Sequence, residues 1–419
     1  MTLAFPRRRA LALLAALAVS PLLQAHDAAA PPLPHIGAFD NHLDIPFDFA
    51  LDAQGALAGS AGQFDLVKAE AGGLKGGVLA VFVPQAARTP EGIKETAAKA
   101  QQKLQLITGI ATAFPERAAV ADSPEAFAAI QASGRFAIVL GILNGQFIGH
   151  DVDQIDAWHA QGVRVFGLTH NGNNDLADSS RPYLLRGDRL GEHGGLSPLG
   201  KAVVARLNAL GMVIDVSQLS GAALEQVLAL SQAPVVASHS NARAIIDHPR
   251  NLDDAQLQAV KRNGGVVAVN AYSSWVRPLP AEAIARLGDI RRSYGVPVEP
   301  VMNGVQPISE AGVTVLPADV FARYSHDFHE VTADPAYRAT LEEYVNQIDY
   351  VVRAIGIDHV GISSDFNHGG GVIGWNDASE TGNVTAELQR RGYSASDIAK
   401  LWGGNFLRVW ADAQAKAQP

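Results

Sequence analysis

Cysteine is absent from the 419-residue chain. The fold therefore contains no disulfide bond, and no thiolate is available as a nucleophile or as a metal ligand. Any metal site must be built from histidine, aspartate and glutamate side chains. Basic runs are also absent beyond the extreme N-terminus, and the net charge is −9. Because phosphate binding needs clustered lysine and arginine, we expect no nucleic-acid partner.

The chain also lacks an apolar run long enough to cross a bilayer comfortably. The apolar stretch Ala10–Leu23 is shorter than the roughly 20 residues that a spanning helix needs. It follows the basic residues Arg7–Arg9 and ends near Ala25, a small residue at a cleavage position. We therefore predict a signal peptide over 1–25, exported by the Sec or the twin-arginine route, and a linker over 26–35. The mature protein is expected to be periplasmic or secreted, without a membrane span.

After the linker, short β-branched runs alternate with stretches rich in alanine, leucine and glutamate, which is typical of parallel strands separated by helices. The predicted strands are Ile36–Asp44, Gly76–Val83, Phe136–Leu143, Val163–Thr169, Met212–Val216, Pro234–Ser238, Gly265–Asn270 and His359–Ser364. Eight such strands predict a single (β/α)₈ TIM barrel over 36–419, with a doubly wound open sheet as the alternative. A stretch rich in proline and glycine at about 275–337 predicts a long loop at the C-terminal face, and Ser394–Ala415 predicts a final helix.

Histidine and aspartate residues stand at the ends of four predicted strands. His42 and Asp44 end the first strand, and because they are two residues apart they point to the same face. His170, His239 and Asp365 end the fourth, sixth and eighth strands. Since barrel strands bring their C-terminal ends to one rim, these side chains are expected to converge. Such a set favours metal-assisted hydrolysis, whereas a hydrogen-bonded pair is the alternative for His42 and Asp44 alone.

Two arginines follow the sixth predicted strand. Arg243 and Arg250 lie close to His239 in the sequence. A guanidinium group suits bidentate binding of a substrate carboxylate. The alternative for either arginine is a surface ion pair with Asp247 or Asp253.

Taken together, six segments of the chain resemble the membrane (renal) dipeptidase family of zinc peptidases. The segments are Asp40–Asp44, Leu168–Asn171, Gly195–Gly200, Ser238–Arg250, Gly361–Phe366 and Trp402–Phe406. The resemblance implies an amidohydrolase-like barrel with a two-zinc site, a small peptide substrate and a homodimer. It also implies residue roles. His42, Asp44 and His239 match zinc ligands, His170 matches a residue that contacts the substrate and its tetrahedral intermediate, and Asp365 matches the acid/base carboxylate.

Two positions depart from the family pattern. Leu143 stands where the family has a glutamate that bridges the two zinc ions, and Gln218 stands where it has a histidine ligand. Leucine cannot bind a metal, and a neutral amide is a poor zinc ligand. We therefore expect one zinc ion rather than two, with a metal-free site as the alternative. His368, three residues after Asp365, is a candidate replacement ligand or else a solvent-facing loop residue.

Two functions fit these residues. The first is an exported, metal-dependent dipeptidase, favoured by the retained ligands and by Arg250, which matches the residue that holds the substrate carboxylate. The second is a metal-poor homologue that binds peptides or catalyses a non-hydrolytic step in the maturation of a peptidic metabolite. It is favoured by Leu143 and Gln218. We predict hydrolysis, because the retained set includes residues that handle the substrate as well as residues that bind metal.

Overall fold

Eight parallel strands in the described part of the chain lie side by side in one sheet. They are β1 (Ala38–Leu43), β2 (Leu74–Val81), β4 (Phe136–Ile142), β5 (Val163–Gly167), β6 (Val213–Asp215), β7 (Val236–Ala237), β8 (Val266–Asn270) and β9 (Val360–Ser363). The last strand returns to the first. Asn41 Nδ2 donates to the carbonyl of Ile362 at 2.8 Å, and the amide of Asp365 donates to the carbonyl of His42 at 3.0 Å. The sheet is therefore a nearly closed (β/α)₈ barrel, as predicted, and not an open sheet.

The computed structural model describes residues 37–49, 51, 62–184, 187–298 and 316–418. The predicted signal peptide (1–25) and linker (26–35) lie outside the described residues. All eight predicted strands are present, each close to its expected bounds. One further strand, β3 (Ala118–Val120), pairs with β4 beside the barrel path and was not predicted. Three residues are too few to show the alternation that identifies a strand in a sequence.

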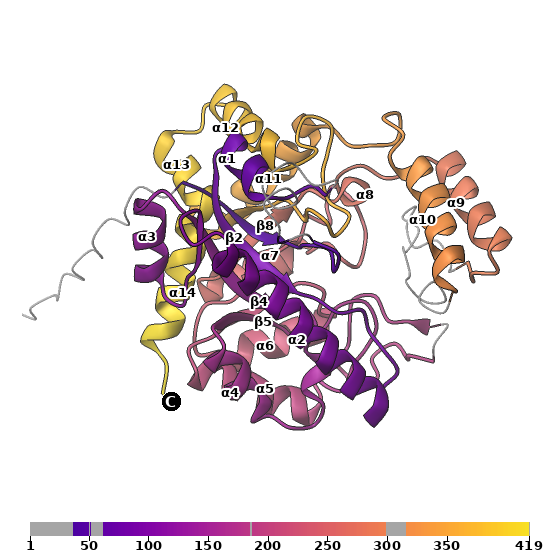
Figure 1. Cartoon of the computed structure of the whole chain (residues 1–419), viewed down its shortest axis with the longest axis horizontal. Coiled ribbons are helices and arrows are strands. Elements are labelled where there is room, and N and C mark those ends of the chain that lie inside the picture. The colour runs from indigo at the N-terminus through magenta and orange to yellow at the C-terminus, as the bar shows by residue number, and fades with distance from the viewer. Residues whose placement is uncertain (1–36, 50, 52–61, 185–186, 299–315, 419) are drawn as a thin grey trace, which may run out of the picture. The chain divides into compact units, whose positions relative to one another are not determined.

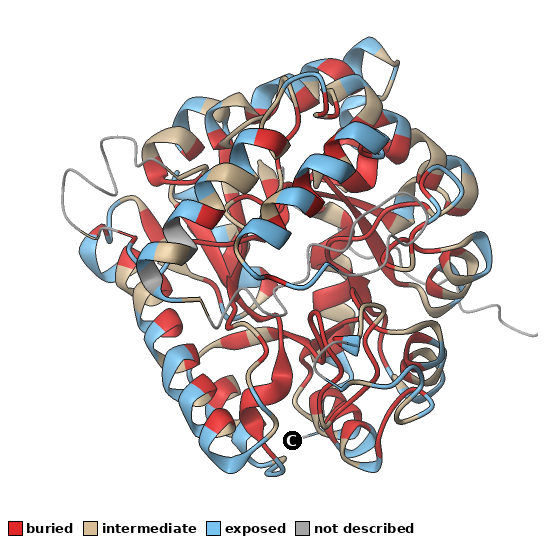
Figure 2. Ribbon diagram, turned by 90° about the vertical axis from the view of Figure 1, so that its right-hand side faces the viewer, coloured by how far each residue is buried: buried red, intermediate tan, exposed pale blue. Residues whose placement is uncertain are grey.

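Helices surround the strands (Figure 1). Those outside the long connection and the C-terminal segment, both described below, are α1 (Leu66–Gly72), α2 (Pro90–Ala113), α3 (Pro124–Ala132), α4 (Gln154–Ala160), α5 (Pro198–Ala209), α6 (Gly221–Leu230), α7 (Asp254–Asn263) and α12 (Thr381–Arg390). Local sequence sets their ends. Thr89, for example, accepts a hydrogen bond from the amide of Gly92, and Pro90 needs no amide partner at the first position of α2. Figure 2 shows buried strands inside and helices that alternate between buried and exposed residues outside, which is the pattern of amphipathic helices on a core.

The connection between β8 and β9 contains α8 (Ser273–Val276), α9 (Ala281–Ser293), α10 (Ala318–Thr332) and α11 (Leu341–Ile355). It includes the segment predicted as a long loop. Leu287 of α9 and Val331 of α10 belong to one small apolar cluster, and the two helices lie side by side in Figure 1. This connection leaves the barrel at its C-terminal face, so it adds bulk next to the site described below.

The last part of the chain differs from the single helix predicted over Ser394–Ala415. It consists of α13 (Ala395–Ala399), one π-helical turn (Lys400–Gly404) and α14 (Asn405–Ala415). Gly403 interrupts the helix with a φ of 122°, and a Cβ at that position would lie 2.7 Å from the Cβ of Phe39 in β1. Close packing against the first strand therefore requires glycine here, and it breaks the helix.

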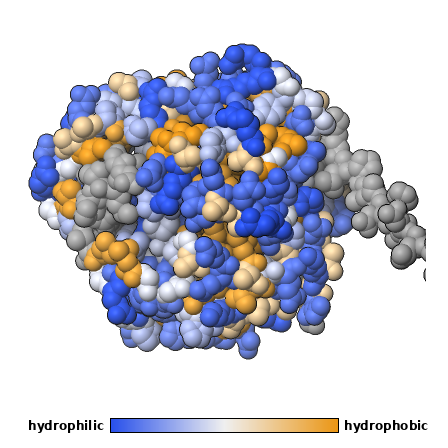
Figure 3. All heavy atoms as spheres, turned by 180° about the vertical axis from the view of Figure 1, so that it is seen from behind, coloured by the Kyte–Doolittle hydropathy of each residue, from blue (hydrophilic) through white to orange (hydrophobic). Residues whose placement is uncertain are grey.

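None of the helices in the described ranges is long and apolar enough to cross a membrane. The face shown in Figure 3 carries hydrophilic side chains with smaller apolar patches between them. Scattered apolar residues of this kind are normal on a folded surface.

Candidate active site

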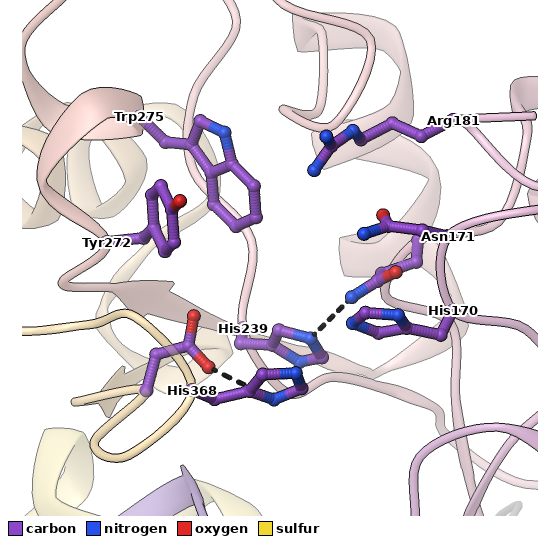
Figure 4. Close-up of a pocket in the computed structure, with 9 residues that line it drawn as sticks. His170, Asn171, Arg181, His239, Tyr272, Trp275 and His368 are labelled. Carbon is purple, nitrogen blue, oxygen red and sulfur yellow. Dashed lines mark hydrogen bonds and ion pairs between the residues drawn. The ribbon is translucent and has the colours of Figure 1, made fainter. Parts of the chain in front are cut away.

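A pocket opens where the C-terminal ends of the strands meet. It contains about 410 Å³ of empty space, its open mouth included. The residues that line it are His170, Asn171, Arg181, Gln218, His239, Tyr272, Trp275, Asp365 and His368. They follow β5, β6, β7, β8 and β9 in the sequence, and Figure 4 shows them facing a common space. The C-terminal rim of a barrel is where active sites of this fold lie.

Backbone strain coincides with this pocket. Among the described residues, the non-glycine residues with a positive φ are Gln218 (71°), Asp365 (58°) and Asn367 (59°). The first two line the pocket, and the third is adjacent to His368. Hydrogen bonds hold this conformation, since the amide of Asp365 donates to the carbonyl of His42 at 3.0 Å. Each such residue costs about 1–3 kcal/mol, and strain of this kind gathers at functional sites.

Two of the lining residues, Asp365 and His368, form a group with His42 that we call the imidazole cluster. One ligand atom from each lies within 4.8 Å of the others. Asp365 Oδ1 is 3.6 Å from His42 Nε2 and 3.9 Å from His368 Nδ1. All three atoms are buried and have no hydrogen-bond partner. Because buried polar atoms are normally satisfied, and because two imidazoles and a carboxylate are a usual zinc ligand set, these residues fit one divalent cation.

Burial also sets the ionisation of this cluster. It lowers the pKa of His42 well below its usual range, and it lowers the pKa of His368 to about 3, with smaller effects from Lys103 and Arg250. Burial raises the pKa of Asp365 to about 7, against the effect of a hydrogen bond from Asn270. Neutral imidazole is the form that binds a metal, so both histidines are in the required state.

His239, a predicted zinc ligand, lies next to this cluster but has partners on both ring nitrogens. Its ring stacks on that of His42 with centroids 4.0 Å apart. Nδ1 is 2.7 Å from Ser238 Oγ, and Gln218 Nε2 is 3.2 Å from its Nε2. Nε2 therefore accepts a hydrogen bond from the side-chain amide of Gln218. A role of His239 as a ligand stays a prediction and requires that this amide move away.

Asp44, the other predicted ligand from the first strand and the residue that directly follows β1, forms an ion pair with Lys103 of α2. The Nζ–Oδ1 distance is 3.0 Å, and the two side chains are only 3% and 6% exposed. Lys103 Nζ also donates to the carbonyl of Ile45. Burial raises the pKa of Asp44 to about 6, and the charge of Lys103 opposes that rise. An ammonium group thus already occupies one oxygen of the predicted ligand.

Lys103 is a site residue that the sequence analysis missed. It stands in the buried stripe of α2 together with Ala100, Leu104 and Ile107. A lysine at a buried position of an amphipathic helix usually has a carboxylate partner. The position of Lys103 in the apolar stripe could have identified it as a buried charge in the sequence. It does not identify the carboxylate that pairs with the lysine.

Leu143, which the resemblance matches with the family's bridging glutamate, is packed against Ala80 and Phe82 in a small apolar cluster. The next residue does not compensate, because Asn144 Nδ2 donates to Gln85 at 3.0 Å. We call Asp44, Lys103 and Leu143 the lysine side of the mouth. A second divalent cation does not fit here, because the nearby groups are the ammonium of Lys103, the apolar side chain of Leu143 and the neutral amide of Gln218.

The remaining predicted residues separate into those at the pocket surface and those away from it. His170 lines the pocket, and its Nδ1 is buried without a hydrogen-bond partner. Arg250 is only 1% exposed and is not among the lining residues, which instead include Arg181. Arg243 forms an ion pair with Asp247 at 3.1 Å, the alternative that the sequence left open.

A barrel with imidazoles and a carboxylate at its C-terminal rim is the architecture of amidohydrolase-like enzymes. The chain belongs to the membrane dipeptidase family (peptidase family M19), whose sequence pattern matches residues 28–419. The family and the curated relative of 30% identity are named as dipeptidases, so the family is one of hydrolases.

Individual relatives support this assignment. The dipeptidase aclJ of Aspergillus oryzae is 30% identical over 365 residues, which cover 85% of this chain and 71% of that protein. The chain spans 59% and 63% of the length of two further curated dipeptidases. The crystal structure of the probable dipeptidase PvdM from Pseudomonas aeruginosa is 45% identical, with a TM-score of 0.81 over 91% of this chain and 96% of that one.

A metallopeptidase from Rhodobacter sphaeroides, solved with a phosphinate mimic of the dipeptide L-Ala-D-Ala, is 21% identical, with a TM-score of 0.68 over 90% of this chain and 99% of that one. At that identity, the similarity shows the common fold alone.

Proposed function

We propose that the protein hydrolyses short peptides at this pocket with the help of one zinc ion at the imidazole cluster. The observation that carries this proposal is the set of three buried ligand atoms, from His42, Asp365 and His368, that have no hydrogen-bond partner. An unsatisfied buried polar group costs about 1–3 kcal/mol. Three of them within reach of one another are best explained by a cation that satisfies all three.

A divalent cation bound there supplies a positive charge that polarises a peptide carbonyl and lowers the pKa of water. His42 would hold it through Nε2, His368 through Nδ1 and Asp365 through Oδ1. The two imidazoles are neutral because of their burial, so no proton competes for these nitrogens.

Asp365 can also move a proton because its two oxygens have different surroundings. Oδ2 accepts a hydrogen bond from Asn270 Nδ2 at 3.1 Å, which fixes the carboxylate and leaves a second lone pair on that oxygen. This oxygen takes a proton from the attacking water and returns it to the leaving amine. His170 lines the pocket beyond His368 and donates from Nδ1 to the oxyanion that develops on the carbonyl.

A second function is favoured by the lysine side of the mouth. Lys103 occupies an oxygen of Asp44, and Leu143 fills the place of the bridging carboxylate with apolar contacts. Both features suit a relative that binds peptides, or that changes them without hydrolysis, and has no two-zinc centre. In this second function, the pocket and its substrate-facing residues still bind the peptide, but no metal ion assists hydrolysis.

We also propose that the protein is exported and is periplasmic or secreted. The support is the sequence of residues 1–25, with its basic start, apolar run and small residue at a cleavage position. A homodimer stays a prediction from the family resemblance.

Hydrolysis of a mixed dipeptide pool, with added Zn²⁺ and separately with a chelator, tests the first function. We expect cleavage with zinc and its loss with the chelator, followed by mass spectrometry of the products. Cleavage in neither condition would contradict hydrolysis and favour the second function. Equal cleavage in both conditions would contradict the role of the cation.

A further inference from the structure

A buried carbonyl oxygen at the pocket has no role in the proposed function. Among the described residues, His170, Asp365 and His368 line the pocket with buried side-chain atoms that have no hydrogen-bond partner, and the proposed function uses all three. Oε1 of Gln218 is a further atom of this kind, on a lining side chain that is only 4% exposed. Because an unsatisfied buried acceptor is costly, we expect this oxygen to meet a donor from a ligand.

A buried carboxylate sets the tautomer of His239. Asp215 Oδ1 accepts from the backbone amides of Ser217 at 2.9 Å and Ser238 at 3.0 Å, and Oδ2 accepts from the hydroxyl of Ser238. Burial raises the pKa of Asp215, and hydrogen bonds from Ser238 and Ser217 oppose the rise. Three donors to one carboxyl group favour its ionised form. Since the single hydroxyl proton of Ser238 is donated to Asp215, Ser238 Oγ accepts from Nδ1 of His239, which is 2.7 Å away.

The tautomer of His239 in turn fixes the amide of Gln218. With its proton on Nδ1, the imidazole presents Nε2 as an acceptor, and Gln218 Nε2 donates to it at 3.2 Å (the dashed line at His239 in Figure 4). Oε1, at the other end of the amide, is then the atom that faces a ligand. The hydrogen bonds therefore run in one direction along a series of four residues that we call the Gln218 chain. They are Gln218, His239, Ser238 and Asp215.

The backbone of Gln218 is also held in place. Its carbonyl accepts from the amide of Ser180 at 2.8 Å and from the hydroxyl of Ser179 at 3.4 Å. Its φ of 71° lies in the left-handed region, which a long side chain rarely adopts. Such a conformation persists only where the surrounding structure imposes it, and it gathers at ligand sites. Gln218 therefore offers Oε1 to the pocket from a fixed position.

We propose that Oε1 of Gln218 accepts a hydrogen bond from an N–H group of the peptide, and that the rest of the Gln218 chain holds the amide in the required orientation. The inference rests on the proposed function and deepens it, because it names the part of the peptide that the pocket recognises. The N–H group comes from one of two sources, the N-terminal ammonium or the peptide bond, and both donate to a carbonyl oxygen. Gln218 is thus a binding residue, and Asp215 and Ser238 are positioning residues.

Calorimetric titration with three ligands tests this inference. The ligands are Ala-Ala, propionyl-alanine, which replaces the ammonium group by hydrogen, and the ester alanyl-lactate, which replaces the peptide N–H by oxygen. A chelator is present, so that turnover does not consume them. The proteins are the wild type, Gln218→Met and the control Gln226→Met. The control removes a glutamine amide of α6 that binds the carbonyl of Gly194 and does not line the pocket.

We expect the wild type to prefer Ala-Ala over the analogue that lacks the recognised N–H group, by about fivefold for a peptide N–H and about tenfold or more for an ammonium. In Gln218→Met this preference should fall by the same factor, and in Gln226→Met it should be unchanged. The change between proteins excludes other contacts that an analogue loses. A change for propionyl-alanine identifies the ammonium as the source, and a change for alanyl-lactate identifies the peptide bond.

Two variants of Ser238 test the positioning role. Ser238→Ala breaks the contact between Asp215 and His239, so the imidazole can change tautomer and the amide can turn over. We expect this variant to lose most of the preference. Ser238→Thr keeps the hydroxyl group and should restore the preference, since Ser238 borders a cavity with about 200 Å³ of empty space that has room for a methyl group. A merely structural role would weaken all three ligands equally.

Two results would overturn the inference: a wild type that prefers Ala-Ala over neither analogue, including one that binds none of the ligands, or a full preference in a folded Gln218→Met variant. Thermal melting establishes that this variant folds. A full preference in Ser238→Ala would refute the positioning role. Cleavage assays with Zn²⁺ separate the inference from the proposed function. A preference that depends on Gln218, without any cleavage, would refute hydrolysis alone. Cleavage of Ala-Ala, with no effect of Gln218 on the preference, would refute this inference alone.

Discussion

The two sides of the barrel mouth differ in whether their buried polar atoms have partners within the protein. In the imidazole cluster, atoms of His42, Asp365 and His368 are buried without hydrogen-bond partners. On the lysine side, Asp44 is paired with Lys103, and Leu143 is packed among apolar neighbours. The first strand contributes to both sides, since His42 lies within β1 and Asp44 directly follows it. The lysine side therefore pairs its buried carboxylate within the protein, whereas the imidazole cluster has three buried polar atoms without such a partner.

This difference shows two ways in which a barrel mouth can hold buried polar groups. A buried carboxylate needs a positive charge nearby, which either a metal ion or an ammonium group provides. In this chain, Lys103 provides that charge from within the protein, so Asp44 is compensated at any metal concentration. We therefore expect metal to affect the imidazole cluster and to leave the lysine side unchanged, and the following variants test that expectation.

Asp365→Asn should have the largest effect, because it removes the group that moves the proton. We expect kcat for dipeptide hydrolysis to fall by about 10²–10⁴-fold or more. The amide oxygen can still accept from Asn270, so folding is retained. Steady-state kinetics measure the loss, and an unchanged melting temperature is the control. Turnover that persists in a folded variant would remove Asp365 from the mechanism.

Lys103→Met should have the largest effect on stability. It leaves Asp44 buried without its partner, and loss of one member of a buried pair costs about 3–5 kcal/mol. Urea denaturation measures the free energy of unfolding. The matched control is Lys99→Met on the same helix, which breaks an exposed pair with Glu95 worth about 0.2–1 kcal/mol. Similar losses in both variants would show that Lys103 is not a buried charge partner.

His368→Ala should weaken zinc binding by about tenfold or more, since loss of even an outer-shell partner usually has an effect of that size. Competition with a coloured chelator measures the affinity. His326→Ala is the control, because His326 lies on the surface of α10 with its side chain 71% exposed. Unchanged affinity in His368→Ala would show that the cation is bound elsewhere, and the predicted set His42, Asp44 and His239 would then be favoured.

We expect the smallest effect, on the number of zinc ions bound, from a variant that introduces the family's residues at positions 143 and 218. The double variant Leu143→Glu/Gln218→His supplies the missing ligands, but Lys103 still occupies Asp44. Native mass spectrometry should therefore find one zinc ion per chain in this variant and in the wild type. Two ions in the double variant would mean that Lys103 does not block the second position.

The barrel and the convergence of its polar residues could be predicted because both depend on the strands. His42 lies at the end of a short buried run, and His170, His239 and Asp365 each follow one. In a parallel barrel, the C-terminal ends of all the strands meet at one rim. Position along the chain therefore determines position in space for these residues.

Lys103 and Arg181 could not be placed in the same way. Lys103 is 59 residues from Asp44 in the sequence, and their contact depends on how α2 packs on the barrel. Arg181 lies in a loop whose path is set by hydrogen bonds to Gly172 and Ser179. The break at Gly403 likewise depends on contact with Phe39. Each contact joins residues that no local pattern relates.

The packing of Phe39 also bears on the order in which the protein can fold. Phe39 stacks on Phe406 of α14 with ring centroids 4.9 Å apart, although the two residues stand near opposite ends of the described chain. During synthesis the N-terminal part leaves the ribosome first. The first strand, which carries His42 and Asp44, therefore has its neighbour β9 and the aromatic residues of α14 only after residues 360–410 have been translated. Until then both edges of the growing sheet are open, and this is the period in which we expect the chain to depend most on protection from aggregation.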